Sequence, residues 1–168
     1  MKKVLQFSGF ISLLLAVVAF ILLMATNAII VKSGNYQVVY EGTVAIFGKT
    51  EHTVLGDLVT HPAPLALIAW ILILVGLIIV LAGVVLPLLK VTALEKFAGV
   101  LNLAALICFV LAGIFMFIVV PNFYAANNTD MPEQAKIGAG WVIGGILSIA
   151  AGAFAICPAV ADFLGKKK

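Results

Sequence analysis

The feature of this sequence that most constrains its fold is a set of four long apolar blocks. They cover approximately 4–31, 64–89, 97–120 and 137–164, and the only Asp, Glu, Lys, Arg or His within them is Asp162. Each block is longer than the roughly 20 residues that a helix needs to cross the hydrocarbon core of a bilayer. Because backbone groups in lipid must be hydrogen-bonded internally, continuous apolar runs of this length predict helices.

Composition points the same way, because the 168-residue chain is 64% hydrophobic and only 10% charged, whereas soluble domains carry about 25% charged residues. The first block follows Met-Lys-Lys, but it is longer than the roughly 7–15 apolar residues of a secretory signal. We therefore expect a retained span and one domain over residues 1–168. The fold class predicted is all-α: an antiparallel four-helix transmembrane bundle with outer loops at about 32–63 and 121–136.

Lysine supplies all the positive charge, since the chain has no arginine. With four spans, three lysines (Lys32, Lys49 and Lys136) fall on one side of the membrane. The other side receives the remaining seven: Lys2, Lys3, Lys90, Lys96, Lys166, Lys167 and Lys168. The positive-inside rule then places both termini in the cytoplasm. We expect an integral multi-pass protein of the plasma membrane. Without a basic face interleaved with aromatic residues, no nucleic-acid partner is expected.

The first outer loop contains a pattern typical of strands. Tyr36–Tyr40 and Thr43–Phe47 are rich in Val, Ile, Tyr and Phe, and Glu41-Gly42 separates them. The pattern predicts a small β hairpin across this pair of segments. In the second outer loop, Pro121 is expected to end the third span, and Asn127-Asn128-Thr129 matches the glycosylation sequon.

Four spans, termini on one side, a long β-rich first outer loop and a short second one form a topology that resembles the claudin-type tetraspan proteins. The segment Gly42-Thr-Val-Ala-Ile-Phe-Gly48 is also similar to a pattern in small bacterial four-span proteins. The resemblance to claudins is one of topology, because the first outer loop here lacks tryptophan and cysteine. It implies the overall shape and carries no claudin function.

Small residues recur every fourth position in the last block, at Gly140, Gly144, Ser148 and Gly152. Residues at this spacing share one helix face. In lipid, helices associate through close packing, and small side chains let two backbones approach. The stripe predicts a helix-packing surface, either within the bundle or against a second copy.

Few residues are candidates for ligand binding or catalysis. Asn102, in the third block, is a candidate polar lining or a partner in an interhelical hydrogen bond. In the first outer loop Glu51, His52, Asp57 and His61 include zinc-ligand types, but their spacing matches no established motif, so no metal and no cofactor is expected. The sequence shows no Ser/His/Asp set, phosphate-cradling loop or paired carboxylates.

These observations favour a non-enzymatic membrane scaffold or accessory protein that acts through its outer loop and lateral helix contacts. Its expected partners are the lipid bilayer and either a second copy or another membrane protein. Two alternatives stay open. One is a small transporter or channel component, and the other is a metal-binding sensor or membrane enzyme.

Overall fold

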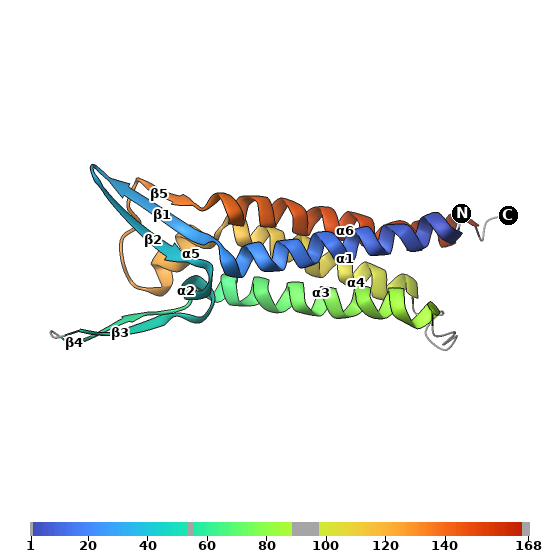
Figure 1. Cartoon of the computed structure of the whole chain (residues 1–168), viewed down its shortest axis with the longest axis horizontal. Helices are drawn as coiled ribbons and strands as arrows, with labels where there is room; N and C mark the ends of the chain where they lie inside the picture. The colour runs from blue at the N-terminus through green and yellow to red at the C-terminus, as the bar shows by residue number, and fades with distance from the viewer. Residues whose placement is uncertain (1, 54–55, 89–97, 166–168) are drawn as a thin grey trace.

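The computed structural model describes residues 2–53, 56–88 and 98–165. Within these ranges, four long helices lie side by side: α1 (Lys2–Ala25), α3 (Pro64–Leu88), α4 (Ala98–Phe117) and α6 (Ala139–Gly165) (Figure 1). All four are long and apolar enough to cross a membrane. At 1.5 Å per residue they measure about 30–40 Å, which matches the hydrocarbon core of about 30 Å. The predicted fold class, a helical membrane bundle with a β hairpin, is confirmed.

The helices form a ring in which α6 packs on α1 and α4, α4 packs on α3, and α3 returns to α1. Both termini lie at one end of the bundle and the strands at the other, here called the outer end (Figure 1). Among the side chains that the structure describes, many outward-facing ones on the long helices are apolar and exposed, among them Phe10, Leu14, Ile21, Ile78 and Ile146. Such a surface is suited to lipid, because exposed apolar area of this extent is rare on soluble monomers.

Beyond the outer ends, three strands form an antiparallel sheet of order β2-β1-β5. Strand β1 (Asn27–Ser33) continues from α1, β2 (Tyr36–Glu41) returns, and β5 (Ala135–Ile137) comes from the second outer loop. Gly34, with φ of 57°, lies in the turn between β1 and β2, where a left-handed residue suits a tight hairpin. The two outer loops therefore share one sheet.

The predicted position of the hairpin was wrong. Tyr36–Tyr40 is a strand, but its partner is β1, which lies within the predicted first span, and 43–47 belongs to the helix α2 (Gly42–Phe47). The first span ends at Ala25 instead of residue 31, because the β-branched run after Asn27 pairs with β2. Lipid-spanning helix and buried strand are both apolar, so hydropathy did not separate them.

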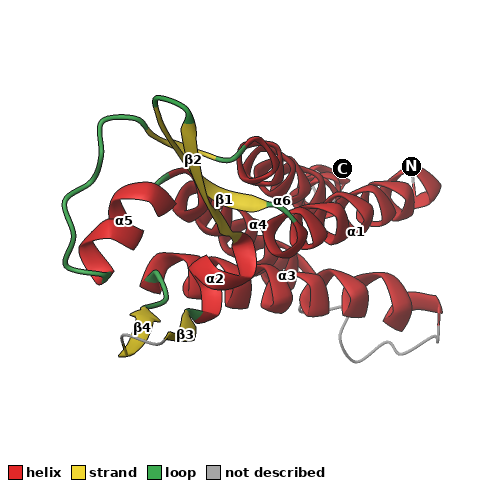
Figure 2. Cartoon of the chain, turned by 60° about the vertical axis from the view of Figure 1, so that its left-hand side comes forward, coloured by secondary structure: helices red, strands yellow, loops and turns green. Residues whose placement is uncertain are grey.

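A second hairpin joins β3 (Lys49–Thr53) to β4 (Gly56–Thr60), in a separate two-stranded sheet. We call it the β3–β4 ribbon. It projects outward from the end of α2, apart from the three-stranded sheet (Figures 1 and 2). The sequence pattern did not predict it.

The other predicted span limits differ by smaller amounts. The second span, 64–89, corresponds to α3, although residue 89 lies outside the described residues. The third, 97–120, divides after Phe117 into α4 and a short helix α5 (Val119–Ala126), so Pro121 does not end helical structure. It occupies the first turn of α5, where a missing N–H costs no hydrogen bond. The fourth, 137–164, begins at Ala139 because β5 extends to Ile137.

Candidate functional site

The small-residue stripe of α6 lies inside the bundle, between α1 and α4. A Cβ atom at Gly144 would stand 2.8 Å from Met116 Cε and 3.5 Å from the Ala19 carbonyl oxygen. At Gly152 it would stand 3.2 Å from the Leu106 carbonyl oxygen. The contacts include a backbone carbonyl oxygen of α1 and one of α4 as well as the Met116 side chain, so a larger side chain would push α6 away from its neighbours.

The other two positions of the stripe contact the same neighbours. At Gly140 a Cβ atom would lie 2.5 Å from the Thr26 Cβ, at the outer end of α1. Ser148 is fully buried, and its hydroxyl donates a 2.8 Å hydrogen bond to the Phe109 carbonyl oxygen of α4. The structure thus brings all four residues into contacts within one chain.

A matching hydrogen bond joins α6 to α1. The Ser12 hydroxyl, also fully buried, donates to the Ala151 carbonyl oxygen over 2.7 Å. Sequence reasoning missed this bond. A serine in the middle of an apolar run was the available signal, because an unpaired hydroxyl in lipid is costly.

Glycines also set the approach of α4 to its other neighbours. A Cβ at Gly76 of α3 would lie 2.5 Å from Phe109 Cε1, so the Phe109 ring fills the space that this glycine leaves. A Cβ at Gly113 of α4 would lie 2.7 Å from the Gly145 carbonyl oxygen. The bundle core is therefore closely packed around Phe109, which is itself fully buried.

Asn102 lies on α4, towards the end of the bundle that carries the termini, and it is partly exposed. Its Oδ1 atom faces α3, where a Cβ at Gly83 would lie 3.8 Å away. The amide therefore sits at the seam between α3 and α4. No other asparagine, and no Asp, Glu, Lys, Arg or His, occurs in the described part of α4.

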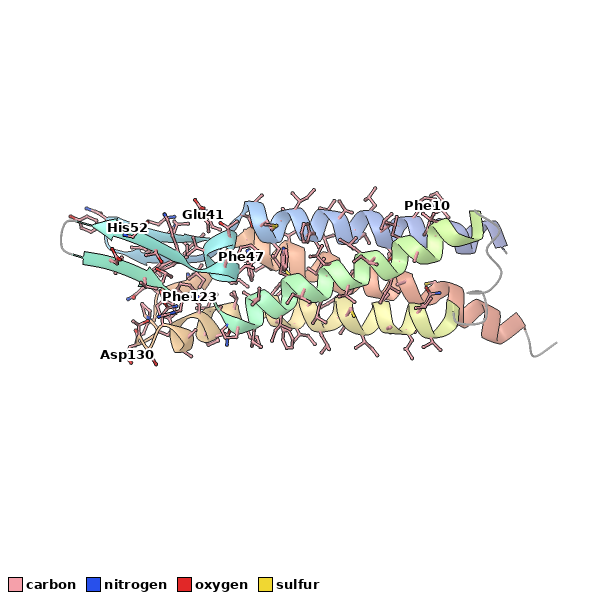
Figure 3. All side chains as sticks on the ribbon, turned by 90° about the horizontal axis from the view of Figure 1, so that it is seen from below. Phe10, Glu41, Phe47, His52, Phe123 and Asp130 are labelled. Carbon is pink, nitrogen blue, oxygen red and sulfur yellow. The ribbon has the colours of Figure 1, made fainter. Side chains whose placement is uncertain are left out.

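The four candidate metal ligands do not converge. On the β3–β4 ribbon, His52 Nδ1 contacts Asp57 Oδ1 at 2.6 Å, and both side chains are exposed (Figure 3 labels His52). Glu51 pairs with Lys49 over 2.6 Å, and strand alternation places it on the opposite face of the ribbon from its neighbour His52. The hydrogen bond and charge of Glu51 raise the pKa of Lys49.

His61 follows the ribbon, and its backbone is hydrogen-bonded to the side chain of Asn127 in the second outer loop. Its N–H donates to Asn127 Oδ1 over 2.8 Å, and its carbonyl oxygen accepts from Asn127 Nδ2 over 3.1 Å. Among residues 2–53, 56–88 and 98–165, no group of three or more His, Cys, Asp or Glu side chains is placed to hold a metal ion.

Two asparagines of the α5 region bond to the start of α3 and to the end of the first outer loop. Asn122 Oδ1 accepts a 2.9 Å hydrogen bond from the N–H of Leu65, in the first turn of α3. Asn127 makes the two bonds to His61 and also donates from Nδ2 to the Phe123 carbonyl oxygen over 2.9 Å. We call this arrangement the asparagine clamp. Sequence reasoning missed it, because its partners are about 60 positions away in the chain.

Aromatic rings fill the space between the sheet and α5. Phe123, labelled in Figure 3, packs against Tyr40 of β2 with ring centres 4.8 Å apart and edge-on against Tyr124 at 5.7 Å. Tyr124 is 7% exposed. Burial, and secondarily the neighbouring Tyr40, raise the pKa of the Tyr124 phenol. The sheet is thus anchored to the bundle through α5.

Further from the bundle the strands expose apolar side chains. Tyr36 is 83% exposed and Val38 52% exposed on β2, and Leu58 is 61% exposed on β4. In the three-stranded sheet β2 is an edge strand, paired only with β1. An exposed apolar edge is able to accept another strand or surface. We call these three side chains with Val39 and Val59 the outer β surface; they belong to two separate sheets and, by strand alternation, lie on both faces of β2 and of β4.

The fold and these contacts define a class: a polytopic four-helix membrane protein whose two outer loops build a common sheet. Searches with protein-family models and among curated proteins find no match to this sequence.

Proposed function

We propose that this protein is a non-enzymatic membrane scaffold or accessory protein that binds a partner through the outer β surface. The observation that carries this proposal is the exposure of Tyr36, Val38 and Leu58 on strands that project beyond the bundle. Exposed apolar side chains outside the membrane mark interaction sites in many proteins. The closely packed helices below them supply a rigid base.

In this proposal the outer end of the bundle faces away from the cytoplasm and the protein resides in the plasma membrane. Four spans put seven of the ten lysines of the sequence on the side of the termini, which favours a cytoplasmic position for that side. The arrangement is then a tetraspan topology of the claudin-like kind. Labelling of intact cells tests the orientation: an impermeant amine reagent is expected to modify Lys49 but none of the lysines near the termini.

The binding proposal is tested by crosslinking from native membranes. A photoreactive amino acid at Tyr36 or Leu58 is expected to give a discrete adduct of one additional protein. The same group at Asn128, an exposed residue of the second outer loop, serves as the control and is expected to give none. If all three positions behave alike, with no adduct or with the same adducts, the outer β surface is not the binding site.

A second candidate function is a small transporter or channel component, favoured by the partly exposed Asn102 amide at the seam of α3 and α4. A polar path along this seam predicts solute or ion flux in liposomes. Replacing Asn102 by Leu would reduce that flux while the protein remains folded. Purified protein that supports no flux above that of empty liposomes would reject this function.

A further inference from the structure

The short helix α2 lies at the level where the spans end. Its first residue, Gly42, donates its N–H to the Thr26 carbonyl oxygen just beyond α1, over 2.8 Å. The Ala45 carbonyl oxygen accepts a 2.8 Å hydrogen bond from the N–H of Ala63, which directly precedes α3. Figure 2 shows α2 between the outer ends of these two helices. These bonds fix α2 across the top of the α1–α3 seam.

The two sides of α2 differ in what they contact. Gly42, Ala45 and Ile46 are buried against the bundle. Phe47 is 50% exposed and packs edge-on against Trp70 of α3, with ring centres 5.3 Å apart. Trp70 in turn lies 6.3 Å from the Phe20 ring of α1. Phe47 is therefore the outermost ring of an aromatic cluster that joins α2, α3 and α1.

The depth of this cluster follows from the length of α3. Its 25 residues measure about 37 Å, which exceeds the hydrocarbon core by about 7 Å. Trp70 is six positions after Pro64, the first residue of α3, or about 9 Å along the axis. The apolar span in this helix begins at Pro64, so Trp70 lies within the membrane-spanning part of α3, and the Phe47 ring packs against it.

Polarity changes sharply after Phe47. Gly48, with φ of 75°, turns the chain, and a Cβ there would lie 2.6 Å from the Thr60 carbonyl oxygen. The next residue, Lys49, begins the β3–β4 ribbon with its ion pair to Glu51. An apolar ring followed within two residues by exposed charges is typical of a segment at the boundary between hydrocarbon and headgroups.

We propose that α2 is an interfacial helix that inserts Phe47 into the outer leaflet of the bilayer, where it extends the lipid-facing surface of α1 and α3. The occupant of the exposed face is lipid because that face continues, through Trp70 and Phe20, into the surface that the spanning helices present to lipid. This insertion fixes where the β3–β4 ribbon leaves the membrane. It is independent of any partner on the outer β surface.

Spin labelling in phosphatidylcholine nanodiscs tests this proposal. In a background of Cys108→Ala and Cys157→Ala, a nitroxide is attached at Phe47→Cys, at Ile71→Cys as a lipid-facing control, and at Leu58→Cys as a ribbon control. Relaxation by oxygen, which concentrates in hydrocarbon, is compared with relaxation by a water-soluble nickel chelate. Position 47 is expected to resemble 71, with oxygen the stronger relaxant, whereas position 58 is expected to favour nickel.

Two results would overturn the proposal. A label at 47 that favours nickel, as at 58, would place α2 in water. A label shielded from both reagents would show that protein, such as a second copy, covers this face. If Phe47→Cys does not fold, Thr43→Cys takes its place, because residues four apart share a helix face and Thr43 is partly exposed. There too, oxygen preference supports insertion and nickel preference or shielding rejects it.

Discussion

Ser148 of α6 donates a hydrogen bond to the carbonyl oxygen of Phe109 in α4, over 2.8 Å and fully shielded from solvent. Phe109 also fills the space left by Gly76 of α3. Phe109 thus links two neighbouring helices by different means: its carbonyl oxygen accepts the serine hydroxyl of α6 on one side, and its ring packs against a glycine of α3 on the other. The bundle depends on small residues for both.

Because the small-residue stripe of α6 is closely packed, a larger side chain there is expected to lower the stability of the protein. Gly144→Leu would drive a side chain into Met116 and the backbone at Ala19, at a cost of about 1–3 kcal/mol or more. The measurement is the midpoint of thermal unfolding in detergent. Leu147→Ile, a conservative change at a partly exposed position, is the control and is expected to shift the midpoint little. Equal midpoints for the two variants would refute the packing role.

The two buried serines are expected to contribute modestly and independently. Removing the hydroxyl by Ser148→Ala or Ser12→Ala should each cost about 0.6 kcal/mol, the average for hydrogen bonds between membrane helices. Because their acceptors, Phe109 and Ala151, lie on different helices, the double variant should show the sum of the two losses. Unfolding of all three variants in one detergent measures this, and marked non-additivity would indicate coupling through α6.

The asparagine clamp predicts that Asn127 stabilises the contact between the outer loops. Asn127→Ala removes both hydrogen bonds to His61, a loss of roughly 1–3 kcal/mol at about 0.5–1.5 kcal/mol per bond. Limited proteolysis should then cut the segment around His61 faster. Thr129→Ala, which changes an exposed side chain in the same loop, is the control. Unchanged cleavage in Asn127→Ala would show that the clamp adds no local stability.

Alkaline pH is expected to destabilise the fold partly through Tyr124. Its pKa is raised in the folded state, first by burial and then by Tyr40, so the folded protein holds this proton to higher pH than the unfolded chain. The contribution of this phenol to the free energy of unfolding is therefore fully present below about pH 10, the ordinary phenol pKa. It is lost as pH rises through the raised value. Lys49, whose pKa is also raised, contributes a loss of the same sign.

The variant Tyr124→Phe separates the contribution of Tyr124 to the alkaline loss of stability from that of Lys49. This variant keeps the ring beside Phe123 but cannot ionise, so its stability should decrease less steeply above pH 10 than that of the parent protein. Denaturant unfolding at pH 8, 10 and 11 provides the comparison. Parallel curves for the two proteins would mean that Tyr124 does not contribute to the alkaline loss.

Hydropathy predicted the spanning helices well because lipid demands long apolar segments whatever their neighbours. It did not locate the end of the first helix. Asn27–Val31 is as apolar as a span apart from Asn27, and only its pairing with β2 and β5 makes it a strand. The prediction of a strand at 43–47 was wrong for a similar reason. The helix there is held by Gly42 N–H bonding to Thr26 and by Phe47 packing on Trp70, contacts that no local pattern contains.

Among the candidate site residues too, some positions follow from a local sequence pattern and others depend on tertiary contacts. Four-residue spacing placed Gly140, Gly144, Ser148 and Gly152 on one face of α6, because that periodicity is a property of the helix itself, and in the structure these positions contact α1 and α4. The composition of the first outer loop could not show that Glu51 and His52 lie on opposite faces of the ribbon, since the ribbon was not predicted. The roles of Asn122 and Asn127 depend on partners distant in the sequence, Leu65 of α3 and His61 of the first outer loop.

The pairing of Ile29 with Ile137 has a consequence for how the chain is made. Strand β1 leaves the ribosome early, but β5 follows only after three of the four long helices have been synthesised. Until then one edge of β1 has no neighbouring strand, and the nascent chain must keep its first outer segment soluble and unaggregated. The sheet can therefore be completed only after α4 and α5 have been synthesised.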